Sequence, residues 1–392
     1  MNRLIYIMAL GAFGIITTEF GVIGILPDLA KNFHVTVDTA GWLLSGFALT
    51  VALTGPFTNA LTAKMNRKTV MSLALGIFVF SNLLSAVAPN FTVLMIARIL
   101  PAFLHPVFWA VAVTAAAKLA GPKEAPKAIA TVMAGLSVAT VIGVPLTTYM
   151  ADLFSWRASF ILSAAINSVA LGALALLGPS MPVSVTQKSS KNQLTLLRSV
   201  SLWVKLIATV LILAGMFATY GYLAEYLAKV THMTGAEISI LLLVFGCTGI
   251  AGNWLMGIAL SKNVLLTARI FLIALIVIHL MAYQFGGNFI PMVIILSFWG
   301  FIHTGGFLAT NVQLTHSQPE SSLDFINSLM PSFFNAGITL GTFLGGFVIS
   351  HYGVQNVVWM SVPLLLVSLM LGFLFQKKSA VNKAIALPQA TH

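Results

Sequence analysis

Two ionisable residues, Glu19 and Arg98, interrupt long apolar stretches of the chain. Glu19 lies about seven residues before the end of an apolar run at 4–26, and Arg98 about six residues after the start of a run at 92–117. If both runs are helices that cross a membrane in opposite directions, a rise of about 1.5 Å per residue places them at similar depth, about 10 Å from one surface. A charge at membrane depth costs about 2.5–3.5 kcal/mol, so each residue is expected to face a partner or a wet cavity.

A buried carboxylate whose distance from a cation changes can bind and release a proton. Burial favours the neutral acid, whereas a nearby cation favours the carboxylate. Movement of Arg98 towards or away from Glu19 could therefore switch the acid between these two forms, and we assign both residues to proton coupling. The alternative is a permanent ion pair that only fastens two helices together.

His105 and Trp109 continue the helix face of Arg98, because offsets of seven and four residues return to the same side of a helix. A neutral imidazole at position 105 could hydrogen-bond a polar substrate or relay a proton. The alternative is a buried histidine satisfied by a backbone carbonyl beside Pro106. We assign His105 and Trp109 to a substrate cavity.

Two further polar residues lie within apolar runs of the second half of the chain. His303 repeats the argument for His105 in the run 288–313, although a structural buried histidine is the preferred interpretation there. Asn335 lies near the middle of the run 324–350, where an amide can contact a substrate or join neighbouring helices. Both residues are included in the predicted substrate cavity.

The elements that carry these residues are predicted to be membrane helices. Hydrophobic residues make up 58% of the 392 residues and charged residues 7%, against about 25% charged in an average soluble protein. Lipid must therefore replace water around most of the chain. Twelve runs have the length of about 20 residues that a helical span needs: 4–26, 39–62, 69–89, 92–117, 128–150, 157–179, 203–228, 237–260, 265–285, 288–313, 324–350 and 353–376.

The basic residues predict the orientation of these spans. Most of them share one side, whereas Lys31, Arg157 and Lys229 fall on the other. Because Lys and Arg concentrate in cytoplasmic loops, both termini are predicted to be cytoplasmic. The net charge of +11 comes from these short loops and not from a basic face, so no nucleic-acid partner is expected. Trp42, Trp156 and Tyr352 are interpreted as anchors at the membrane interface.

The longest polar break, at 181–202, divides the spans into two sets of six. We predict an all-α membrane protein of twelve transmembrane helices in two pseudo-symmetric six-helix bundles, residues 1–180 and 203–380, joined by a cytoplasmic linker at 181–202 and followed by a cytoplasmic tail at 381–392. The segments NALTAKMNRK (59–68) and GIALSKNVLL (257–266) echo each other. Duplicated halves are how secondary transporters build a site at the membrane midplane.

The residue inventory argues against other classes of membrane protein. Cys247 is the lone cysteine, so an intramolecular disulfide and a CxxC metal site are excluded. A Walker nucleotide-binding motif is absent from the sequence, and the buried polar residues form neither a nucleophile with its base nor a metal-ligand cluster. We expect no enzyme, no cofactor and no metal, with coupling to a proton gradient. A receptor or scaffold that transports nothing remains the other alternative.

Several segments carry a resemblance to a known family: TTEFGVIGILPDLA (17–30), AGWLLSGFALTVALTGP (40–56), IARILPAFLHPVFWAV (96–111), GLSVATVIGVPLTTYMADLFSWRASF (135–160) and DFINSLMPSFFNAGITLGTFLGG (324–346). Together they resemble the major facilitator superfamily, specifically its twelve-span drug:proton antiporter branch and bacterial exporters of sugars, purines and drugs. The loop at 59–68 is similar to the superfamily's signature loop, but it keeps only Leu61, Arg67 and Lys68, and Ala63 replaces the usual Asp.

The resemblance implies a function and several roles. It implies a monomeric, proton-coupled antiporter that exports a small solute such as a drug, sugar or nucleoside across a bacterial cytoplasmic (inner) membrane by alternating access. Arg67 and Lys68 would belong to a conformational motif, and Gly143 and Pro145 to an antiporter motif that bends the fifth span and seals the inner end of the cavity. A uniporter or a proton symporter of the same fold is the alternative.

Overall fold

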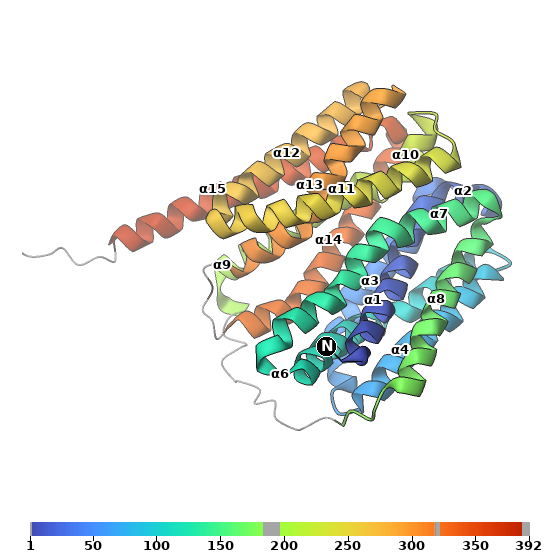
Figure 1. The fold of residues 1–392 in the computed structure, drawn as a ribbon. Helices are drawn as coiled ribbons and strands as arrows, with labels where there is room; N and C mark the ends of the chain where they lie inside the picture. The colour runs from blue at the N-terminus through green and yellow to red at the C-terminus, as the bar shows by residue number, and fades with distance from the viewer. Residues whose placement is uncertain (1, 183–196, 317, 319–321, 386–392) are drawn as a thin grey trace, which may run out of the picture.

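A computed structural model describes residues 2–182, 197–316, 318 and 322–385, and this part of the chain is helical and connected by short turns (Figure 1). The predicted linker at 181–202 and tail at 381–392 fall largely outside the described residues, although residues 381–385 continue the last helix. The architecture is all-α, as the sequence predicts.

The first helix group comprises residues 3–177. Its elements are α1 (Arg3–Gly21), a 3-10 turn (Val22–Ile25), α2 (Leu26–Phe33), α3 (Val37–Thr62), α4 (Arg67–Ala86), α5 (Phe91–Ala102), α6 (His105–Val138), a π turn (Ala139–Gly143), α7 (Val144–Leu153) and α8 (Trp156–Leu177).

The second helix group comprises residues 200–385. Its elements are α9 (Val200–Tyr220), α10 (Leu223–Lys229), α11 (Gly235–Lys262), α12 (Val264–Phe285), α13 (Phe289–Thr315), α14 (Leu323–Tyr352), a 3-10 turn (Val354–Asn356) and α15 (Val358–Ile385).

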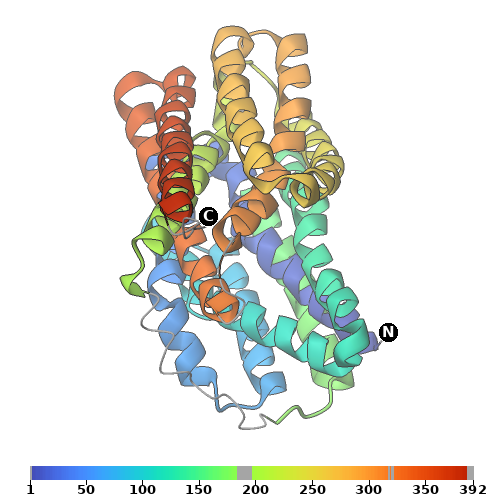
Figure 2. The same cartoon turned by 90° about the vertical axis from the view of Figure 1, so that its left-hand side faces the viewer.

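The described residues contain eleven helical segments that are long and apolar enough to cross a membrane. The difference from the predicted twelve arises at Phe91–Leu153, a continuous segment of 63 residues that covers the predicted runs 92–117 and 128–150. At about 1.5 Å per residue, a straight helix of this length would be about three times as long as the hydrocarbon core is thick. The segment is not straight, because α6 joins two helical stretches across a kink at Gly121, whose φ of 75° is outside the helical region (Figure 2).

In three of the predicted runs the regular α-helix is interrupted. The α-helical part of the run 4–26 ends at Gly21 and is followed by a 3-10 turn. The run 92–117 breaks between α5 and α6, where Pro101 and Pro106 flank the break and disfavour regular helix hydrogen bonding. The run 128–150 contains the π turn that precedes Pro145. These breaks place Glu19 near the end of α1 and His105 at the start of α6.

The two opposite ends of the helix bundle are named here after Asp38 and Arg67. The Asp38 end carries the start of α3 together with α2 and α10, and the Arg67 end carries the start of α4 together with the start of α1. Between the two helix groups, α3 packs along α14, and α7 with the preceding π turn packs on α11. These two seams hold the groups together.

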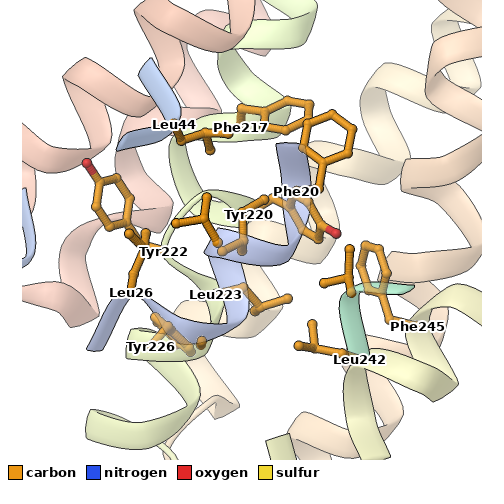
Figure 3. Close-up of a cluster of buried hydrophobic side chains, with 14 of the residues drawn as sticks. Phe20, Leu26, Leu44, Phe217, Tyr220, Tyr222, Leu223, Tyr226, Leu242 and Phe245 are labelled. Atoms are coloured by element: carbon orange, nitrogen blue, oxygen red, sulfur yellow. The ribbon is translucent and has the colours of Figure 1, made fainter. Parts of the chain in front are cut away.

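The apolar core is shared between the groups only in part. One cluster combines Phe20 and Leu44 of the first group with Phe217, Tyr220 and Leu242 of the second (Figure 3). The Phe20 and Phe217 ring centroids lie 5.7 Å apart. The other two clusters each belong to one group, with buried members between residues 4 and 174 and between residues 202 and 326. Side chains near the Arg67 end therefore pack largely within their own group.

Candidate functional site

Glu19 is buried in the last turn of α1, with 2% of its surface exposed. Its Oε2 atom lies 3.0 Å from Nε2 of His105, and this is the ion-pair contact of the Glu19 carboxylate in the described structure. The sequence placed His105 on the face of Arg98 but did not pair it with Glu19. The structure therefore gives the carboxylate a titratable partner different from the predicted one.

Arg98 lies beside Glu19 but contacts its backbone. The guanidinium of this fully buried residue donates hydrogen bonds to the carbonyl oxygens of Thr18 and Glu19, the latter at 3.0 Å. The last four carbonyls of a helix lack partners within the helix, so Arg98 satisfies two of the groups that the end of α1 leaves free. The Phe47 ring lies 5.3 Å from the guanidinium carbon. Glu19 and Arg98 lie side by side, but the Arg98 guanidinium does not pair directly with the Glu19 carboxylate.

His105 connects Glu19 to Trp109. Trp109 donates from Nε1 to Nε2 of His105 at 3.2 Å, so the same ring nitrogen lies near both the indole and the carboxylate. Nδ1 of His105 is buried without a hydrogen-bond partner in the described structure. The alternative in which a backbone carbonyl satisfies this ring is therefore not what the structure shows.

Two amides that the sequence analysis missed complete the polar cluster around α1. Asn82 and Asn167 donate from Nδ2 to Oγ1 of Thr18 at 2.9 and 3.1 Å, and Asn167 also reaches the carbonyl of Gly14 at 3.1 Å. Both asparagines are almost completely buried. An amide near the middle of an apolar run was the available signal, and the same reasoning that selected Asn335 would have selected these residues.

His303 lies on α13 inside an aromatic enclosure of the second helix group. Its ring centroid is 4.6 Å from that of Tyr220, 5.5 Å from Phe245 and 5.8 Å from Phe217. Both ring nitrogens are buried without a hydrogen-bond partner in the described structure. Because buried polar atoms are normally paired with protein or water, His303 offers hydrogen-bonding capacity to a polar guest.

A second histidine, His279, lies near this enclosure and was also missed. Its Nδ1 lies 2.7 Å from the carbonyl oxygen of Leu275, and its ring centroid is 4.8 Å from that of Trp299. Nε2 of His279 and Nε1 of Trp299 are unpaired among the described residues.

Asn335 is buried on α14 and is bonded within its own helix. Its Nδ2 donates to the carbonyl of Pro331 at 3.0 Å, whereas its Oδ1 is buried without a partner in the part of the chain that the structure describes. The structure does not place it in hydrogen-bonding contact with Glu19 or His303. Asn335 thus retains a free acceptor, while its donor serves the helix.

The predicted conformational residues occupy two different places. Gly143 ends the π turn and packs on α1, where an added Cβ would lie 2.2 Å from Oγ1 of Thr17. Pro145 is the second residue of α7. The π turn contacts α11 through Val141 and Gly246, near the middle of that helix, and the expected sealing of the inner end of the cavity stays a prediction.

Arg67 and Lys68 form hydrogen bonds to other helices of the first helix group at the Arg67 end. Nη1 of Arg67 lies 3.3 Å from Oγ1 of Thr114 on α6, and Nζ of Lys68 donates to the carbonyl of Ala175 near the end of α8 at 2.8 Å. These two residues therefore tie α4 to α6 and α8 within one group.

The described residues contain no group of three His, Cys, Asp or Glu side chains that could hold a metal ion. The polar cluster of Glu19, Arg98, His105 and Trp109 can exchange a proton between a carboxylate and an imidazole. The enclosure around His303 holds two unpaired ring nitrogens among aromatic rings. Both arrangements lie inside a bundle of apolar helices.

Comparison with known proteins places the chain in a family. Residues 8–330 match the profile of the Major Facilitator Superfamily. The chain is 30% identical over 357 residues to the uncharacterized MFS-type transporter YtbD of Bacillus subtilis, with 90% of each chain covered. It is 25% identical over 353 residues to a probable sugar efflux transporter of Helicobacter pylori, again with 90% of each covered.

The fold also resembles that of solved transporter structures. A solved structure of a bacterial homologue of the human lysosomal transporter Spinster, in an inward-facing and occupied conformation, superposes with a TM-score of 0.75 at 14% identity, covering 96% of both chains. Similarity at this level concerns the fold alone. Together with the profile match, these findings show that the chain belongs to the Major Facilitator Superfamily and is a membrane transporter, not an enzyme.

Proposed function

We propose that this chain is a proton-coupled antiporter that exports a small solute across a bacterial cytoplasmic membrane by alternating access. The observation that carries the proposal is the buried Glu19 carboxylate 3.0 Å from the His105 imidazole. A proton that reaches this pair is held away from water between two groups that can each bind it.

Nε2 of His105 links the protonation of the Glu19–His105 pair to Trp109, because this nitrogen contacts both Glu19 and Trp109. This nitrogen bears either a hydrogen or a lone pair, so it cannot donate to Glu19 and accept from Trp109 at the same time. When Nε2 carries a proton, it pairs with the carboxylate and Trp109 loses its acceptor. When Nε2 is unprotonated, Trp109 can bind it. Proton transfer therefore changes the partner of the half-buried Trp109, which can report the change to a bound solute.

The helix arrangement supports a state that is closed at the Asp38 end. The shared cluster around Phe20 and Phe217 joins the two groups, while the other apolar clusters are confined to single groups. Under the proposed topology the kinked segment Phe91–Leu153 crosses twice, which gives twelve spans in two six-helix bundles with both termini cytoplasmic. The Asp38 end then faces outward, the site opens inward, and the transporter works as a monomer.

For the solute we propose a small, hydroxyl-bearing molecule such as a sugar, nucleoside or hydroxylated drug. The free nitrogens of His303 and the free Oδ1 of Asn335 can bind hydroxyl groups, and the rings around His303 can pack against an apolar face. The name of the Helicobacter pylori relative, a probable sugar efflux transporter, supports the same class. A proton symporter or a uniporter of this fold is the alternative.

The test uses Glu19→Gln with Glu225→Gln as the matched control, because Glu225 is a second buried glutamate outside the polar cluster. Cells that overproduce each variant are first screened for reduced accumulation of glucose, inosine and chloramphenicol. The solute that the wild type exports is then followed in proteoliposomes, together with internal pH, under an imposed proton gradient.

We expect the wild type and Glu225→Gln to move protons and solute in opposite directions. Glu19→Gln should lose gradient-driven transport at least tenfold but retain exchange of labelled for unlabelled solute without a gradient, because Gln can still hydrogen-bond His105. Full gradient-driven transport by Glu19→Gln would contradict the role of this carboxylate. Solute and protons moving in the same direction would identify a symporter, and solute movement without protons a uniporter.

A further inference from the structure

A separate pocket lies at the Asp38 end, away from the Glu19 cluster. It has a volume of about 180 Å³ and lies between the start of α3 and the end of α14. Its walls include Asp38 and Trp42 from the first helix group and Tyr222, Phe343, Phe347 and His351 from the second. Pockets for drug-sized ligands are about 300–1,000 Å³, so this one suits a group the size of a lipid headgroup.

Asp38 gives the pocket its charge. Its carboxylate is partly buried, and it takes part in no hydrogen bond or ion pair within the described structure. Asp38 lies in the first turn of α3, where the helix dipole stabilises a negative charge. The dipole explains an acidic residue at this position but does not explain the aromatic rings around it. A carboxylate without a cation in a partly enclosed pocket is available to a positively charged guest.

Aromatic side chains form much of the remaining wall. The rings of Trp42 and Phe343 meet edge to face with centroids 5.7 Å apart, and Phe347 stacks on His351 at 4.3 Å. Aromatic faces attract organic cations, and Trp does so most strongly. A calcium or magnesium ion would instead need several oxygen ligands, whereas this pocket has one carboxylate. The chemistry of the walls selects an organic ammonium.

We propose that this pocket binds an organic ammonium group, with Asp38 as the counter-ion and Trp42, Phe343 and Phe347 as the aromatic wall. A soluble amine and the ethanolamine headgroup of a lipid both present this chemistry. The pocket is at an end of the bundle where the exposed Trp42 and Phe347 side chains lie beside the ends of two spans, so both sources can reach it.

Binding here favours one arrangement of the two helix groups. Tyr222 forms part of the wall, and its hydroxyl donates a hydrogen bond to the carbonyl of Thr342 at 2.9 Å. The same hydroxyl fits between Gly41 and Gly346, because an added Cβ would lie 2.0 Å from it at Gly41 and 2.5 Å from it at Gly346. The walls come from α3 and from the second group, so the complete pocket exists only while these elements touch. A ligand that binds one state shifts the population towards it. The binding site stands independently of the proposed function, whereas its effect on turnover rests on alternating access.

Binding is tested on the full chain in detergent with choline chloride as the probe, by titration calorimetry, with sodium chloride at equal ionic strength as the blank. Asp38→Asn should weaken choline binding about tenfold or more, Trp42→Leu roughly 3- to 30-fold, and Asp38→Glu only slightly. Asp152→Asn, an exposed acidic residue at the same end, is the matched control and should bind as the wild type does.

Two outcomes overturn the site: no choline binding by the wild type up to 10 mM, or unchanged binding by a folded Asp38→Asn variant. Nanodiscs then separate the sources. Weaker choline binding in phosphatidylethanolamine–phosphatidylglycerol nanodiscs than in diacylglycerol–phosphatidylglycerol nanodiscs of equal surface charge identifies the lipid headgroup as the occupant, and equal binding identifies soluble amines. Spin labels at Lys31→Cys and Gln355→Cys in a Cys247→Ser background should show a narrower distance distribution with choline, and an unchanged one would refute the coupling to closure.

Discussion

Glu19 has two partners that act on different parts of the residue. Arg98 binds the backbone carbonyls of Thr18 and Glu19, and His105 meets the carboxylate. Loss of Arg98 would leave two buried carbonyls unpaired, at a cost of about 1–3 kcal/mol each, because such groups are expensive to bury without a donor. Arg98 therefore holds the end of α1 in place, while the titratable contact of Glu19 belongs to His105.

At the residue scale, Trp109→Phe tests the competition for Nε2 of His105. The substitution removes the indole donor, so Nε2 of His105 no longer exchanges Trp109 for Glu19 as its partner. We expect the number of protons moved per exported solute to fall about twofold or more in proteoliposomes, because a proton at Nε2 no longer alters a contact of residue 109. Trp254→Phe, at an exposed tryptophan of α11, is the control. A proton-to-solute ratio identical to that of the wild type would show that Trp109 does not compete for this nitrogen.

At the scale of elements, the interrupted helices bring the site together. The end of α1, the break between α5 and α6, and the π turn before α7 each expose backbone groups that a continuous helix would satisfy internally. Such irregular backbone is tolerated at membrane depth where protein encloses it. The Arg98 guanidinium and the Thr147 hydroxyl, which approaches the carbonyl of Gly21 at 3.4 Å, are examples of this enclosure.

The contact between α1 and the π turn depends on Gly143. A Cβ at this position would lie 2.2 Å from Oγ1 of Thr17, so Gly143→Ala is expected to lower the free energy of unfolding by about 1–3 kcal/mol. Thermal unfolding in detergent measures the change. Gly172→Ala on α8 meets nothing within 4 Å and should be neutral.

A second substitution separates this clash from other effects of the alanine. Thr17→Ala removes the hydroxyl that the new methyl group meets, and it should restore part of the stability lost in Gly143→Ala. If the double variant lost as much free energy of unfolding as the two single variants lose together, the contact with α1 would not be the reason that position 143 is glycine.

At the scale of the whole molecule, the Asp38 end holds the two helix groups together through apolar packing and through Tyr222. Gly41→Ala would place a methyl group 2.0 Å from the Tyr222 hydroxyl and should push α3 away from the second group. We expect a membrane-impermeant thiol reagent to label Ser45→Cys, whose parent side chain is 2% exposed, at least several-fold faster in this variant, in a Cys247→Ser background.

The matched control is Gly76→Ala, whose added Cβ would approach no atom closer than 4.0 Å. Equal labelling in Gly41→Ala, Gly76→Ala and the parent would mean that the Tyr222 contact does not keep this end closed. The same assay with choline present also connects the Asp38 pocket with closure, because a bound cation should slow labelling.

The class of the molecule follows from the amino-acid sequence, and so does the position of each polar residue along its predicted helix. A chain with 7% charged residues and repeated apolar runs can be stable only in lipid. Its motifs indicated the superfamily, which the profile match confirmed. The similar depth of Glu19 and Arg98 also followed from sequence, because the rise per residue of a helix is nearly constant.

Which side chains contact one another depends on how the helices pack. Depth along a helix can be counted from residue numbers, but the direction in which a side chain points depends on helix breaks and on how neighbouring helices pack. For this reason the partner of the Glu19 carboxylate proved to be His105, and Asn82 and Asn167 entered the cluster from α4 and α8. The Asp38 pocket likewise required the packing of α3 against α14, which no local sequence pattern encodes.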